Sequence, residues 1–122
     1  LGTFTGQCAL LFKKVIELRK SDKQLHVYDT FGTSFKFKGD IVEKLKANFK
    51  SAQLQLPVIH KGDFFETLPA QLPEKLSFIH VDCGFGVDPL YQKKLMIQFF
   101  YKGEIVIFSI RNLIDREHEF FR

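Results

Sequence analysis

The chain is poor in the residues that mark several classes of protein. Among 122 residues it has no tryptophan, one methionine, four prolines and two cysteines. Cys8 and Cys83 alone cannot build a disulfide framework or a four-cysteine zinc site. Both cysteines have apolar neighbours in the sequence, so we expect reduced thiols packed in the core of a cytoplasmic protein.

Long runs of one residue class are also missing. No apolar run approaches the ~20 residues that a membrane span needs, and the first residues lack the basic and apolar regions of a signal peptide. Basic residues never occur in runs longer than two, although the net charge is +4. Most of the 15 phenylalanines lie in apolar runs, where burial explains them better than stacking on bases. We therefore expect neither a membrane nor a nucleic acid as partner.

Helical and extended patterns alternate along the chain. Helical spacing of apolar residues predicts helices over residues 7–20, 65–72, 89–100 and 112–121, and a further helix that Asp40 caps, with Glu43 completing a capping box. Continuous apolar runs predict strands at residues 25–28, 58–60, 77–81 and 105–108. This order predicts an α/β fold, a doubly wound three-layer sandwich with a mainly parallel sheet, as a single domain over residues 1–122.

The polar residues at the strand ends are the candidates for chemistry, because ligands of open α/β sheets bind beyond the carboxyl ends of the strands. Asp29, Asp63 and Asp82 follow or end three of the four predicted strands. The Gly2–Gly6 loop precedes the first helix and would offer N–H groups to an anion, or it is an ordinary turn. Asp29 would accept the hydroxyls of a ribose, or it caps a turn.

Histidine offers one further candidate. His80 lies two residues before Asp82, so both side chains leave the same face of a strand and could together act as a general base. The alternative is a core histidine bonded to the backbone. His26 and His60 have no spacing typical of metal ligands, and we predict no metal site from them.

Five stretches of the chain, in order, resemble one enzyme family. They are Leu1-Gly2-Thr3-Phe4-Thr5-Gly6, His26-Val27-Tyr28-Asp29-Thr30-Phe31, His60-Lys61-Gly62-Asp63-Phe64, Thr67-Leu68-Pro69 and His80-Val81-Asp82-Cys83. The chain resembles the S-adenosylmethionine-dependent O-methyltransferases of the macrocin-O-methyltransferase-like group from Leu1 to about Phe108. The stretch from His26 to Phe31 is fairly specific, whereas the glycine loop is not.

The resemblance implies a doubly wound, Rossmann-like sheet and methyl transfer from S-adenosyl-L-methionine to a hydroxyl of a small molecule. It assigns the methionine end of the cofactor to the loop of Gly2, Thr3, Phe4 and Gly6. It assigns the ribose to Asp29 and Thr30, and the adenine to Gly62, Asp63 and Phe64. Asp82 and His80 are then the candidate catalytic residues.

The chain departs from this family at the acidic positions. Gly84 stands where a second carboxylate is usual, and Ser109 and Ile110 replace a pair of aspartates. Asp82 alone is a poor cage for a divalent cation, so we expect no metal. The alternative function is a noncatalytic nucleotide-binding relative.

The two ends of the chain leave alternatives open. The family's first strand would precede Leu1, so the chain is either part of a longer protein or a reduced relative. Phe120 and Phe121 suggest a homo-oligomer contact or cover for a sheet edge. The sequence does not identify the methyl acceptor.

Overall fold

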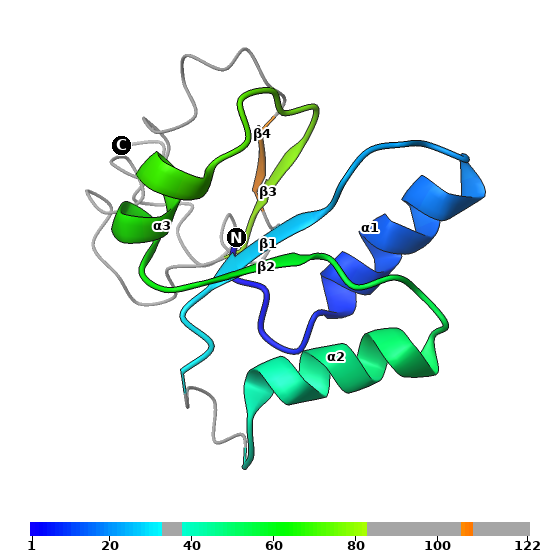
Figure 1. Cartoon of the computed structure of the whole chain (residues 1–122), viewed down its shortest axis with the longest axis horizontal. Coiled ribbons are helices and arrows are strands. Elements are labelled where there is room, and N and C mark those ends of the chain that lie inside the picture. Colours follow the sequence, from blue (N-terminus) through cyan, green and yellow to red (C-terminus); the bar gives the residue numbers. More distant parts are fainter. Residues whose placement is uncertain (33–37, 83–105, 109–122) are drawn as a thin grey trace, which may run out of the picture. The chain divides into compact units, whose positions relative to one another are not determined.

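The protein is described by a computed structural model, which defines residues 1–32, 38–82 and 106–108 (Figure 1). Its helices and strands alternate, as predicted for an α/β protein. They are α1 (Gln7–Leu18), β1 (His26–Asp29), α2 (Ile41–Ser51), β2 (Val58–Lys61), α3 (Phe64–Gln71), β3 (Ile79–Val81) and β4 (Val106–Phe108). The helices predicted over residues 89–100 and 112–121 lie outside the described residues.

The observed elements differ from the predicted ones mainly at their ends. Strand β1 begins and ends one residue later than predicted, so Asp29 is its last residue. Strand β3 is shorter at its start, and α1 ends at Leu18. Pro69 lies within α3, although we expected prolines to bracket this helix.

All strand pairing among the described residues is parallel. Strand β1 pairs with β2, with Asp29 opposite Lys61, and β3 pairs with β4, with Val81 opposite Phe108. The chain divides into two compact units, residues 3–63 and residues 1–2 with 64–122. We call them the Asp29 unit and the Asp82 unit, and describe each by itself.

The core of the Asp29 unit lies between its two strands and its two helices, α1 and α2 (Figure 1). Leu45 and Phe49 of α2 are completely buried. The other buried members of this core are Ala9, Val27, Phe31, Ile41 and Leu54. Because one cluster includes side chains from β1, α1 and α2, both helices contribute to a single hydrophobic core.

Helix α2 begins as the sequence predicts. The Glu43 N–H donates a hydrogen bond of 3.1 Å to Asp40 Oδ1, so Asp40 is the N-cap. The side chain of Glu43 accepts a hydrogen bond from Lys46 Nζ at 2.9 Å. The apolar side of the helix follows from the spacing of Ile41, Leu45 and Phe49, which are all buried.

The expectation for Cys8 on helix α1 is wrong. Cys8 is exposed rather than packed in the core. Leu11, Val15 and Leu18 are 63%, 50% and 69% exposed, although their spacing is that of a core-facing side. The physical reason is that α1 packs through its other side, where Ala9 is buried and Leu10 contacts the core cluster.

The Asp82 unit is built on β3 and α3. Ile79 and Val81 are buried on β3, while His80 between them is partly exposed, as expected for alternate residues of a strand. The N-terminal nitrogen of Leu1 donates to His80 O at 2.7 Å, and Asp82 N–H donates to Leu1 O at 3.0 Å. Among the described residues, no helix has both the length and the apolar character needed to cross a membrane.

Candidate functional site

Three of the predicted segments meet at the carboxyl end of the β1–β2 pair. The Phe4 N–H, in the loop before α1, donates to Asp29 Oδ2 at 2.8 Å. The Gly62 N–H, just after β2, donates to Asp29 O at 3.0 Å. Asp29 therefore contacts both the glycine loop and the end of the neighbouring strand.

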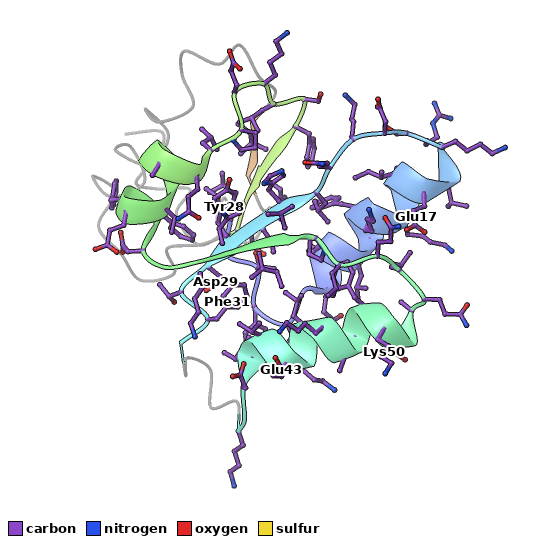
Figure 2. All side chains as sticks on the ribbon, viewed as in Figure 1. Glu17, Tyr28, Asp29, Phe31, Glu43 and Lys50 are labelled. Atoms are coloured by element: carbon purple, nitrogen blue, oxygen red, sulfur yellow. The ribbon has the colours of Figure 1, made fainter. Side chains whose placement is uncertain are left out.

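The carboxylate of Asp29 is the centre of this arrangement, which we call the Asp29 cluster (Thr3, Phe4, Asp29, Thr30 and Phe31). Its second oxygen, Oδ1, accepts the Phe31 N–H at 3.0 Å and the Thr30 hydroxyl at 3.4 Å. The Thr3 hydroxyl donates to the carbonyl oxygen of Tyr28, the residue before Asp29, at 3.3 Å. Figure 2 shows Asp29 and Phe31 together at the end of β1.

Two phenylalanines of the cluster have an unusual backbone conformation. The φ angle is 50° at Phe4 and 52° at Phe31, in the left-handed region that bulky residues rarely adopt. Such a conformation costs on the order of 1–3 kcal/mol per residue. Both strained residues donate their N–H to the same carboxylate, so Asp29 stabilises the two strained turns at once.

The glycine loop is a tight turn fixed to the helices around it. The Gly6 N–H donates to Thr3 O at 2.9 Å, and Asn48 Nδ2 of α2 donates to Thr5 O at 3.0 Å. Gly6 has φ 85° and is the N-cap of α1, where within the described part of the chain it has no side-chain capping bond. The first N–H groups of α1 and the helix dipole are thus available to an anion at this end of the helix.

The remaining predicted cofactor residues are distributed over both units. Thr30 and Asp63 belong to the Asp29 unit and are exposed. Thr30 comes after β1, and Asp63 comes after β2. Gly2, with φ 74°, and Phe64 are assigned to the Asp82 unit. Phe64 is the first residue of α3 and is buried there.

The predicted catalytic pair is found at the end of β3. Burial lowers the pKa of His80, the positive amino group at residue 1 lowers it further, and Asp82 acts in the opposite direction. Asp82 is partly buried, and its Oδ1 has no hydrogen-bond partner among the residues that the structure describes. This oxygen is itself buried, and a carboxylate oxygen without a partner can still accept a hydrogen bond.

Sequence reasoning missed a histidine pair on β1 and β2. His26 Nδ1 lies 2.9 Å from His60 Nε2, and the two rings are nearly parallel, with 12° between their planes and their centroids 5.2 Å apart. Tyr28 stacks on His60, with ring centroids 4.2 Å apart and 7° between the planes. The contact of these three rings follows from the parallel register of β1 and β2. Tyr28 is opposite His60, and His26 lies two residues before Tyr28 on the same face of the pair.

The environment of this group shifts the pKa values of His26 and Tyr28. Burial lowers the pKa of His26, and the charge of His60 lowers it further. Burial raises the pKa of Tyr28 to about 12, so this phenol stays protonated and neutral at physiological pH. One proton between the two imidazoles gives a single hydrogen bond, whereas protonating both rings would place two like charges in contact.

The described residues contain no group of three or more histidine, cysteine, aspartate or glutamate side chains that could hold a metal ion. Gly84, Ser109 and Ile110, where the resemblance would require carboxylates, lie outside these residues, as does Cys83. Comparisons of the chain with protein-family models, with curated proteins and with solved structures give no match.

Proposed function

We propose that the chain binds S-adenosyl-L-methionine at the carboxyl end of β1 and β2, as part of a methyltransferase acting on a hydroxyl of a small molecule. The observation that carries this proposal is the position of Asp29, which ends β1 and directly contacts the glycine loop. The proposal includes a doubly wound, three-layer sheet of the Rossmann type, of which the parallel pairs β1–β2 and β3–β4 would be parts.

The ribose is the part of the ligand that Asp29 suits best. A carboxylate has about four lone-pair sites, and in Asp29 two of them accept the N–H groups of Phe4 and Phe31. A third accepts the Thr30 hydroxyl in a long bond of 3.4 Å, which a ribose hydroxyl would replace. These bonds hold the carboxylate in one orientation. The remaining lone pairs can accept two vicinal hydroxyls as charge-assisted hydrogen bonds. Thr30, exposed beside Asp29, would border the same sugar.

The two ends of the cofactor would extend from the ribose in opposite directions. The methionine carboxylate is an anion and suits the loop of Thr3, Phe4 and Gly6, because α1 begins there without a side-chain cap in the described structure. The adenine would lie near Gly62 and Asp63. Gly62 has φ 150°, a conformation that favours glycine and leaves the backbone accessible to a flat ring.

Methyl transfer to a hydroxyl requires a base. The hydroxyl oxygen attacks the methyl carbon of the sulfonium, the carbon–sulfur bond breaks with its electrons going to sulfur, and the hydroxyl proton passes to the base. Asp82 is the proposed acceptor of that proton, because its buried Oδ1 has no hydrogen-bond partner among the described residues, and His80 is the second candidate.

A noncatalytic nucleotide-binding relative is the second candidate function. Gly84, Ser109 and Ile110 favour it, because they replace the acidic residues that the resemblance associates with catalysis. Calorimetry with S-adenosylmethionine, followed by an assay for S-adenosylhomocysteine release over a panel of hydroxylated acceptors, separates the two. Binding with turnover supports the enzyme, and binding without turnover supports the second candidate.

The substitution Asp29→Asn tests the proposed ribose contact. We expect cofactor affinity to fall by about 1–3 kcal/mol, because charge-assisted hydrogen bonds to the ribose are lost. Asp22→Asn is the matched control, since Asp22 is an exposed aspartate of the same unit.

Asp29 also holds the two strained turns, so a ligand series is needed to separate its two roles. The wild-type chain should bind adenosine more tightly than 2′,3′-dideoxyadenosine, and Asp29→Asn should abolish this difference. Equal loss of affinity for both nucleosides would show that Asp29 acts only on the loop. Failure of the wild-type chain to bind S-adenosylmethionine or S-adenosylhomocysteine would refute the proposal.

A further inference from the structure

Helix α1 has a second apolar side that no described part of the chain covers. Leu11, Val15 and Leu18 are each at least half exposed, and Cys8 is exposed at the start of the helix. We call these four residues the outer stripe of α1. A surface helix normally presents polar residues on the side away from its core.

The outer stripe has the geometry of a coiled-coil seam. Its residues are separated by three, four and three positions, which is the a/d spacing of a heptad. At 3.6 residues per turn their directions span about 80° around the helix axis. The stripe lies roughly opposite Ala9 and Leu10, through which α1 packs on its own core. This narrow stripe matches a partner helix better than the broad apolar side of a membrane-bound helix.

Cations border the stripe on both sides. Lys14 lies one turn before Leu18 on one side of the stripe, and Arg19, the C-cap of α1, lies beyond Val15 on the other side, in the positions that flank a heptad seam. Both side chains are exposed. In a second copy of the chain, Lys14 would face Arg19 in a parallel pair or Lys14 in an antiparallel pair. Like charges therefore disfavour self-association through this stripe.

We propose that the outer stripe of α1 binds an amphipathic helix of another protein, with apolar a and d positions and acidic residues flanking them. The apolar side chains of the partner would cover Leu11, Val15 and Leu18, and its carboxylates would pair with Lys14 and Arg19. This inference is independent of cofactor binding, since it uses no residue of the Asp29 cluster.

Two synthetic peptides of about three heptads test the proposal. Both carry leucine at a and d, and one carries glutamate and the other lysine at e and g. Each is added to the isotopically labelled 122-residue chain and followed by nuclear magnetic resonance, which detects weak binding. We expect the glutamate peptide to bind at least about tenfold tighter, with shifts centred on the outer stripe.

Variants of the chain then establish which groups are responsible. Leu11→Gln and Leu18→Gln should each weaken binding of the glutamate peptide about tenfold or more. These residues are exposed, so the fold should be retained. Glu17→Gln, an exposed change on the same helix outside the stripe, should leave affinity unchanged. The double variant Lys14→Glu/Arg19→Glu should reverse the preference between the two peptides.

Four results would overturn the proposal. They are binding of neither peptide, equal binding of both, self-association of the chain that Leu11→Gln abolishes, and binding to phosphatidylserine vesicles that competes with the glutamate peptide. The third would identify a second copy as the occupant, and the fourth a membrane surface.

Discussion

At the scale of single residues, the most informative group is the carboxylate of Asp29. It accepts the N–H groups of two phenylalanines in left-handed conformation, which come from separate segments of the chain. Strained backbone of this kind persists only where the surroundings determine it, and it is frequent in ligand sites. Its coincidence with the predicted nucleotide site is the reason we assign a function to this end of β1.

Gly6, in the loop before α1, occupies a position where a side chain would destabilise the fold. Its φ is 85°, and a Cβ added there would lie 3.0 Å from Leu45 Cγ, which is completely buried. Gly6→Ala should therefore lower the free energy of unfolding by at least about 1 kcal/mol, from the backbone conformation alone. Urea unfolding measures this change.

The matched control is Gly32→Ala. Among the residues that the structure describes, an added Cβ at Gly32 would meet only Thr30 Oγ1, at 3.7 Å, which is an ordinary contact. We expect this variant to be close to the wild type in stability. Equal loss of stability in both variants would contradict our account of the loop.

The pair His26 and His60 should make stability depend on pH. Because burial and His60 lower the pKa of His26, the folded chain binds fewer protons than the unfolded chain below the ordinary histidine pKa of 6.5. The free energy of unfolding should therefore fall as the pH is lowered from neutrality through 6.5 towards the lowered pKa of the folded state. Chemical unfolding at a series of pH values measures the slope.

His26→Asn should reduce this slope, since asparagine keeps a polar group near the position of Nδ1 and does not titrate. His80 should make the free energy of unfolding depend on pH in the same direction, because its pKa is also lowered, mainly by burial. The comparison therefore includes His80→Asn, alone and together with His26→Asn. A slope that His26→Asn leaves unchanged would contradict the lowered pKa of His26.

At the scale of helices and strands, the sequence predicts short-range features well. The cap at Asp40 follows from a short-range pattern and is found in the structure. The strand predicted before Asp29 is also found, with both ends one residue later. Helical spacing predicts α1, but Leu11, Val15 and Leu18 lie on its exposed side. That helix has apolar residues on two sides, and periodicity alone does not tell which side packs on the core.

The N-cap of α2 supports a quantitative prediction. Asp40→Ala should lower the free energy of unfolding by about 1 kcal/mol, because the Glu43 N–H loses its acceptor. Asp40→Asn should lose much less, since an amide oxygen is an equally good cap. Thermal or urea unfolding of the two variants tests this difference. Equal destabilisation by both substitutions would indicate a role for the charge of Asp40 rather than for its hydrogen bond.

At the scale of the whole molecule, alternation of helices and strands was sufficient to predict parallel pairing. Strands β1 and β2, and strands β3 and β4, pair in parallel as expected for units joined by helices. The contact between His26 and His60 was not predictable, because it joins residues 34 positions apart through the exact register of two strands. A shift of one residue would have placed these rings on opposite faces.

The distribution of carboxylates over the chain leads to a prediction about metals. Hard cations such as Ca²⁺ take 6–8 oxygen ligands, and Mg²⁺ near-octahedral coordination. Of the acidic positions that the resemblance implies at the strand ends, Asp82 is present, whereas Gly84, Ser109 and Ile110 have no carboxylate. Asp88 is the nearest further acid, and the Pro89 that follows it suggests a helix cap.

We therefore expect cofactor binding and methyl transfer to continue in excess chelator, and titration with Mg²⁺ to give no binding heat. Asp82→Asn should lower the rate of methyl transfer without changing cofactor affinity, because Asp82 then acts as the proton acceptor and not as a metal ligand. Calorimetry and the assay for S-adenosylhomocysteine measure the two quantities separately. Activity that chelator abolishes and Mg²⁺ restores would show that a metal, held by Asp82 and ligands we have not identified, activates the acceptor hydroxyl.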